Sequence, residues 1–206
     1  MLGFVAIGTV YAADDYNVEG RYKRIKPGRP LEQTDKVEVV DVFWYGCPHC
    51  HQFLPLIQKW EAGKPEYVEF KHLPAIFADS WAVHARAYYT AQVLSVDGKL
   101  HQLIFDAIHN EKRALNTREE IMVFFAENGV SNDDFSAAYD SFSVDIMARE
   151  SQVMPRRWGV QGTPAVIVNG RYVISGKLAG SYEDMIKVLE VLVEREHKAM
   201  ADRLQQ

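Results

Sequence analysis

A strand pattern that runs directly into a cysteine-bearing helix constrains this fold most strongly. Residues 36–45, KVEVVDVFWY, carry apolar side chains on both alternating faces, which is typical of a strand covered on both sides in an α/β sheet. After Gly46 the apolar residues take helical spacing, until Gly, Lys and Pro at 63–65 end the pattern. Cys47 is therefore predicted to lie at a strand-to-helix turn, with Pro48 in the first helical turn, where its missing N–H costs nothing.

The rest of the chain divides into two strand-containing parts separated by a helical block. Residues 67–74 predict a second strand, which completes a βαβ unit, and residues 22–27 predict an edge strand. Residues 79–158 show only helical spacing, and Pro155 is expected to kink or end the last helix of this block. Two β runs then follow, joined by Asn-Gly at 169–170, which is a strong hairpin signal. A closing helix is predicted to begin at Ser181.

A C-x-x-C at the first helix of this strand and helix order is a thioredoxin-like arrangement. We predict an α/β fold with a mixed central sheet and an inserted helical domain. The thioredoxin-like domain is assigned residues 20–76 and 155–206, and the inserted domain residues 77–154. Residues 1–13 are interpreted as the remnant of a signal peptide, because an uncharged apolar stretch precedes a small-residue pattern; a buried N-terminal segment is the alternative.

Charge and cysteine content limit the partners and the cross-links of the chain. The 206 residues carry a formal net charge of -5, so they offer no basic face, and nucleic acid is not an expected partner. Cys47 and Cys50 are the only two cysteines. No structural disulfide is possible beyond the one that they can form with each other, and the fold must rely on packing.

The stretch from Cys47 to His51, CPHCH, allows three interpretations. It can attach a c-type haem, form a redox dithiol, or contribute to a zinc site with His49 or His51. The haem motif of small cytochromes lies within a helix, whereas here Gly46 ends a buried strand. We therefore favour a redox dithiol that needs no cofactor or metal, and keep a haem or zinc carrier as the alternative of another class.

The predicted position of the dithiol suggests distinct roles for its residues. A thiolate at a helix N-terminus is stabilised by unpaired N–H groups and by the helix dipole. Cys47 is expected to be an exposed thiolate of low pKa, and Cys50, one turn further, its buried partner. Pro48 and His49 lie between them, and His49 is expected to add a donor or partial positive charge near the Cys47 sulfur. A lowered thiol pKa makes the disulfide more oxidising.

Asp41 stands in an otherwise apolar strand, six residues before Cys47. When a substrate thiolate attacks Cys47, Cys50 leaves and must take up a proton. Asp41 is our candidate for this proton transfer. The alternative is that Asp41 is solvated at the sheet end or paired with Lys71.

Thr163 and Pro164 form the predicted second half of the site. Proline at the start of a buried strand is unusual unless the peptide bond before it is cis. In a thioredoxin-like fold this loop packs beside the dithiol, where the backbone of Thr163 can pair with an extended substrate peptide. A trans proline at a strand start is the alternative.

These features resemble the DsbA family of thioredoxin-like proteins. The resemblance is carried by C-P-H-C at 47–50 with Asp41 upstream, by WAV at 81–83, and by GVQGTPAVIVNGRY at 159–172. It spans about residues 20–200. It implies a periplasmic monomer that oxidises reduced, unfolded exported polypeptides and is itself reoxidised by a DsbB-type quinone-linked membrane oxidase.

Two positions depart from the family pattern. Thr163 stands where the best-known members carry valine, and Leu54 where some carry glutamate. A disulfide isomerase or a reductase with the same fold is therefore the alternative function. Isomerases are usually dimers, and because no separate dimerisation segment is visible in the sequence, we favour an oxidase.

Overall fold

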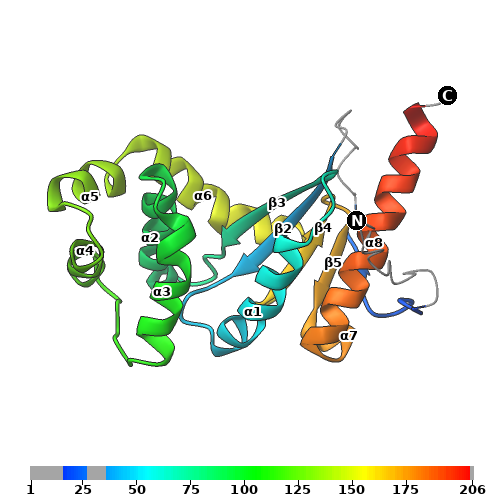
Figure 1. Cartoon of the computed structure of the whole chain (residues 1–206), viewed down its shortest axis with the longest axis horizontal. Helices are drawn as coiled ribbons and strands as arrows, with labels where there is room; N and C mark the ends of the chain where they lie inside the picture. Colours follow the sequence, from blue (N-terminus) through cyan, green and yellow to red (C-terminus); the bar gives the residue numbers. More distant parts are fainter. Residues whose placement is uncertain (1–15, 27–35, 205–206) are drawn as a thin grey trace, which may run out of the picture.

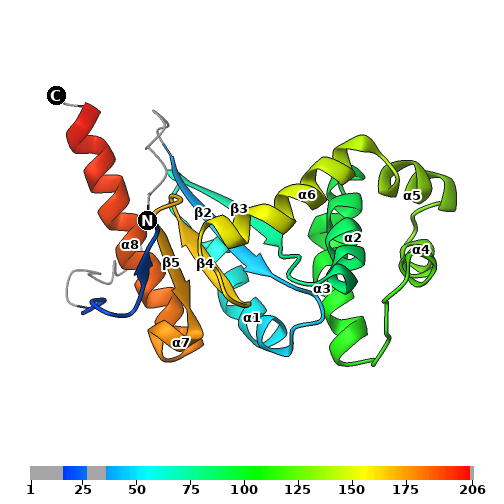
Figure 2. The same cartoon turned by 180° about the vertical axis from the view of Figure 1, so that it is seen from behind.

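The computed structural model of the chain describes residues 16–26 and 36–204 and is built around one mixed sheet (Figures 1 and 2). The strand order is β1-β5-β4-β2-β3. β2 is parallel to the edge strand β3, and every other neighbouring pair is antiparallel. The strands are β1 (Lys23–Arg24), β2 (Val37–Phe43), β3 (Val68–Pro74), β4 (Ala165–Val168) and β5 (Tyr172–Ser175). The predicted mixed sheet and the edge strand are confirmed.

Helices α1 (Pro48–Ala62) and α8 (Tyr182–Leu204) lie on one face of the sheet, with the short helix α7 (Gly176–Ala179) at its lower end in Figure 1. The core on this face is formed by apolar side chains from β2, α1 and α8: Val39, Phe43, Phe53, Ile57, Met185, Val188, Leu189 and Leu192. The opposite face of the sheet buries a second set of side chains, including Val40, Val42, Ala165 and Ile167. β2 is thus covered on both sides, as its sequence predicted.

A block of helices connects β3 to β4 and lies beside the sheet (Figure 1). It begins with the 3-10 helix η2 (Asp79–Trp81) and contains α2 (Ala82–Val93), α3 (Asp97–His109), α4 (Arg118–Glu127), α5 (Asn132–Tyr139) and α6 (Phe142–Arg157). Thr117 and Glu120 form a capping box at the start of α4. The boundaries of the two domains at residues 76/77 and 154/155 stay a prediction, and the predicted signal-peptide remnant, residues 1–13, lies outside the described residues.

Helix α6 does not end at Pro155 but continues to Arg157, so the expectation that the proline ends this helix was wrong, whereas a kink at Pro155 stays a prediction. Proline has no N–H to donate to the carbonyl four residues earlier, which here belongs to Ser151. The backbone N–H of Ile76, just after β3, donates to this carbonyl instead at 3.2 Å. The Ser151 carbonyl, which the proline leaves free, therefore joins α6 to the segment that follows β3.

Two stacked tryptophans join the end of β2 to the helical block. The rings of Trp44 and Trp81 are parallel within 2° with their centroids 3.9 Å apart. Gly46 lies under this stack, since a Cβ at this position would be 2.4 Å from the Trp44 ring. The segment between β2 and α1 is therefore packed against the helical block on its way to Cys47. No helix of the part described is both long and apolar enough to cross a membrane.

Candidate active site

The two cysteines lie at the start of α1, directly after the β2 strand. Cys47 is the N-cap residue of α1, with an extended backbone (φ -89°, ψ 114°), and Pro48 occupies the first turn. The backbone N–H groups of Cys50 and His51 donate to the Cys47 carbonyl at 3.1 and 3.2 Å. Both cysteines are free thiols. The predicted strand-to-helix position of the dithiol is confirmed.

The two thiols differ strongly in acidity. The pKa of Cys47 is lowered to about 5, mainly by a hydrogen bond from the Cys50 thiol. Burial raises this pKa, but the Thr163 hydroxyl and the backbone N–H groups of Cys50 and His49 lower it further. The pKa of Cys50 is raised well above its ordinary value by burial and by the bond to, and charge of, Cys47. At neutral pH the reduced protein therefore carries its thiolate on Cys47.

The side chain of Cys47 is less accessible than the sequence suggested. Only 7% of the residue is exposed, against 3% for Cys50. The Thr163 loop covers it, and the Cys47 thiol can donate to the Thr163 carbonyl at 3.4 Å. The expectation of an exposed Cys47 was therefore wrong, because the loop before β4 lies on the sulfur.

Thr163 and Pro164 are joined by a cis peptide bond, as the sequence predicted. Thr163 acts on Cys47 in two ways that depend on the protonation state of the thiol. Its carbonyl accepts the thiol proton, whereas its hydroxyl stabilises the thiolate and lowers the pKa of both cysteines. This loop therefore lies in direct contact with the dithiol.

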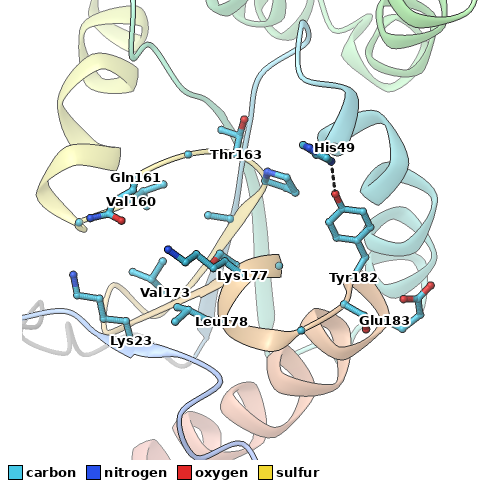
Figure 3. A pocket seen from close by; sticks show the side chains of 18 residues that line it. Lys23, His49, Val160, Gln161, Thr163, Val173, Lys177, Leu178, Tyr182 and Glu183 are labelled. Carbon is cyan, nitrogen blue, oxygen red and sulfur yellow. Dashed lines mark hydrogen bonds between the residues drawn. The ribbon is translucent and has the colours of Figure 1, made fainter.

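A groove of about 930 Å³ begins beside the dithiol (Figure 3). His49, Thr163 and Tyr182 line one end of the groove in Figure 3. Pro164 also lines the groove, and the Thr163 carbonyl lies 3.4 Å from Sγ of Cys47. Apolar side chains from the neighbouring segments form much of the remaining wall: Val160, Ala165, Val173 and Leu178. An extended peptide segment is of the right shape and polarity for such a groove.

His49 contributes to the site through its backbone as well as its ring. Its backbone N–H is the donor that stabilises the Cys47 thiolate. Nδ1 of its exposed ring lies 2.8 Å from the Tyr182 hydroxyl, so the ring is held by a residue that the sequence did not single out. His51 belongs to different surroundings, since Nε2 of its ring lies 3.3 Å from Asp106 of α3. Among residues 16–26 and 36–204, no cluster of three or more His, Cys, Asp or Glu is arranged to hold a metal ion.

Asp41 is buried within the sheet, with 3% of the residue exposed. One carboxylate oxygen lies 3.0 Å from Nδ1 of His72, which is its neighbour in the register of β2 and β3. The alternative pairing with Lys71 was wrong, because that ammonium group contacts Glu38 and Glu69, each at 3.0 Å. The other Asp41 oxygen has no hydrogen-bond partner among the described residues.

The fold and the dithiol at the α1 N-terminus define a thioredoxin-like thiol:disulfide oxidoreductase. The sequence profile of the DSBA-like thioredoxin domain matches residues 72–183. The thiol:disulfide interchange protein DsbA of Azotobacter vinelandii is 37% identical, over 90% of this chain and 86% of its own length. Its counterpart in Pseudomonas aeruginosa is 36% identical, over 93% and 91%. The chain belongs to the DsbA family.

Solved structures lead to the same assignment. The crystal structure of Pseudomonas aeruginosa DsbA has a TM-score of 0.83 and 36% identity, and the match covers 91% of this chain and 97% of that one. The oxidoreductase DsbA of Xylella fastidiosa has a TM-score of 0.80 and 35% identity, over 86% and 96%. These similarities confirm the dithiol interpretation of CPHC over the haem and zinc alternatives. The chain is a protein disulfide oxidoreductase.

Proposed function

We propose that this enzyme is a periplasmic oxidase that donates the Cys47–Cys50 disulfide to reduced, unfolded exported polypeptides. The acidity of Cys47, whose pKa is lowered to about 5, is the observation that carries the proposal. The same contacts that lower this pKa stabilise the reduced protein, since only the reduced form contains the thiolate. A stabilised reduced form makes the disulfide a strong oxidant.

The reaction proceeds in two exchange steps. A substrate thiolate attacks Sγ of Cys47, the Cys47–Cys50 bond breaks, and Cys50 leaves with the bonding electrons and then takes up a proton, as its raised pKa favours. A second substrate thiolate then attacks the substrate sulfur of the mixed disulfide, and Cys47 leaves as a thiolate. Two substrate thiols are thereby oxidised and the enzyme dithiol is reduced.

The remaining site residues have supporting roles in this scheme. The backbone of Thr163 pairs with the substrate segment that flanks its cysteine, and Pro164 presents no N–H and no metal ligand to the sulfurs. Pro48 and His49 are the dipeptide that contributes to the acidity of Cys47, through a fixed helix start and a backbone donor. Asp41, buried on β2, assists the protonation of Cys50.

The membership of the DsbA family supports the assignment of compartment and partners. We expect the protein to act as a monomer in the periplasm, and a DsbB-type quinone-linked membrane oxidase to restore its disulfide. Isomerase or reductase activity is the alternative, since Thr163 stands where the best-known family members carry valine. Its hydroxyl lowers the pKa of both cysteines and can change the balance between oxidised and reduced enzyme.

The equilibrium reduction potential of the Cys47–Cys50 pair tests this proposal. The purified protein is equilibrated with glutathione redox buffers, and the oxidised form is assayed with a reduced peptide. We expect a potential well above that of thioredoxin and rapid oxidation of the peptide, whereas Cys47→Ser should be inactive. A potential near the thioredoxin value of about -270 mV, or efficient rescue of a scrambled substrate without net oxidation, would overturn the oxidase assignment.

A further inference from the structure

Tyr182 makes a side-chain contact with the dipeptide between the two cysteines. It is the first residue of α8, and its hydroxyl lies 2.8 Å from Nδ1 of His49 (Figure 3). The two residues are separated by 133 positions in the sequence. Both line the groove beside the dithiol. The ring of His49 is thus held by the start of α8.

The position of the Tyr182 ring is fixed by its neighbours. It packs against Phe53 of α1, with the ring centroids 5.8 Å apart. Its edge lies over Gly176 of α7, where an added Cβ would be 3.3 Å from Cε1. The start of α8 is itself capped, since the Ser181 hydroxyl accepts the Asp184 N–H at 2.9 Å. Tyr182 therefore offers His49 a preorganised partner.

The Tyr182 hydroxyl keeps its proton near the thiolate. Its pKa is raised by burial and then by the negative charges of Cys47 and Cys50. A protonated phenol can donate to Nδ1 of a neutral imidazole or accept from Nδ1–H of an imidazolium. The other charged side chains along the groove, Lys23, Lys177 and Glu183, point away from this pair in Figure 3.

We propose that Tyr182 is a positioning residue that orients the His49 imidazole and so holds the Pro48-His49 turn in place beside Cys47. A hydrogen bond to a charged group is roughly twice as strong as one between neutral groups. The His49 backbone N–H stabilises the Cys47 thiolate, which exists only in the reduced enzyme, so a His49 turn held in place favours the reduced enzyme over the disulfide form. Tyr182 thereby makes the disulfide more oxidising.

The variant Tyr182→Phe tests this inference, because it keeps the packing ring and removes only the hydroxyl. We expect its equilibrium constant with glutathione to shift about two- to five-fold toward the oxidised enzyme, and the Cys47 thiolate absorbance to titrate at higher pH. Tyr67→Phe is the matched control, because it removes another tyrosine hydroxyl that makes a side-chain hydrogen bond. Tyr67 donates to Glu194 of α8 at 3.0 Å and does not line the groove. This control should keep the wild-type equilibrium.

A double-mutant cycle with His49→Gln separates positioning from a general structural effect. Without the imidazole, Tyr182→Phe should change the equilibrium by less than about 1.5-fold. The ¹⁵N shifts of the His49 ring should also change in Tyr182→Phe. An unchanged equilibrium in Tyr182→Phe, or an equal shift with and without His49, would overturn the inference. This inference rests on the proposed function only for the meaning of a more oxidising disulfide. Its test compares variants with the wild type, whereas the oxidase proposal depends on the reduction potential of the wild type itself, so the two can fail separately.

Discussion

Asp41 and His72 form a hydrogen-bonded pair inside the sheet, with 3.0 Å between Oδ2 and Nδ1. Both side chains are largely covered, at 4% and 15% exposed. The other ring nitrogen of His72 lies 4.0 Å from the carboxylate of Glu61, which is 38% exposed. The pair therefore connects a buried carboxylate with a group that reaches solvent.

We expect Asp41→Asn to slow peptide oxidation about ten-fold. The loss of a residue that acts directly as a general acid or base slows a reaction about 100-fold or more, but here water can partly replace the carboxylate. The loss should be in the step in which Cys50 leaves. Stopped-flow tryptophan fluorescence of the oxidised enzyme mixed with a reduced peptide measures it. Lys71→Gln is the control. Lys71 precedes His72 in the sequence, but its ammonium group contacts Glu38 and Glu69 and not Asp41. A wild-type rate in Asp41→Asn would exclude a role in proton transfer.

Thr163→Val should raise the pKa of Cys47. The variant keeps the size of the side chain but removes the hydroxyl that stabilises the thiolate. A hydrogen bond to a charged group is worth about 1.5–3 kcal/mol, and one pKa unit equals about 1.4 kcal/mol, so we expect a rise of about one to two units. Titration of the thiolate absorbance at 240 nm checks this. Thr163→Ser retains the hydroxyl and should titrate like the wild type; a rise of equal size in both variants would assign the effect to packing.

The Cys47 thiolate also makes the stability of the reduced protein depend on pH. Its pKa is about 9 in the unfolded chain and about 5 in the folded protein. Because the folded value is the lower one, the stabilisation is complete above about pH 9 and is lost as the pH falls to about 5. Between pH 7 and pH 5 the free energy of unfolding should fall by about 2 kcal/mol more than in Cys47→Ser. Urea unfolding of both reduced proteins measures the difference, and parallel pH profiles would contradict it.

Gly46→Ala should destabilise the junction between the strand and the helical block. The added Cβ would lie 2.4 Å from the Trp44 ring, which stacks on Trp81. Forced overpacking of this kind typically costs about 1–3 kcal/mol, and we expect a loss in this range by urea unfolding. Adding Trp44→Leu in the same chain should recover part of the loss, because the clashing ring is then absent. Stability equal to the wild type in Gly46→Ala would show that Trp44 moves aside freely.

Local sequence signals predicted much of the fold. The two-sided apolar pattern identified β2, and Asn169-Gly170 identified the hairpin. Each of these signals acts over a few residues, so the physics that produces it is contained in a short window. The dithiol and the cis proline were predictable for the same reason.

Contacts between distant segments could not be predicted in this way. Whether Asp41 pairs with Lys71 or with His72 depends on the register of β2 against β3, which neither strand pattern fixes alone. Helix α6 continues past Pro155, and the Ser151 carbonyl that the proline leaves free accepts from the backbone N–H of Ile76, which is seventy-five residues away in the sequence. Tyr182 has no local feature that marks it, and only the fold brings it to His49.

Both cysteines of these 206 residues lie in the active site. Apolar packing and hydrogen bonds hold the rest of the described fold together, with no cross-link to be made beforehand. A newly made copy of this enzyme therefore needs no disulfide in order to fold. In the proposed role the enzyme is not one of its own folding clients, and the oxidant that forms its Cys47–Cys50 disulfide is all that a new copy needs before it can act.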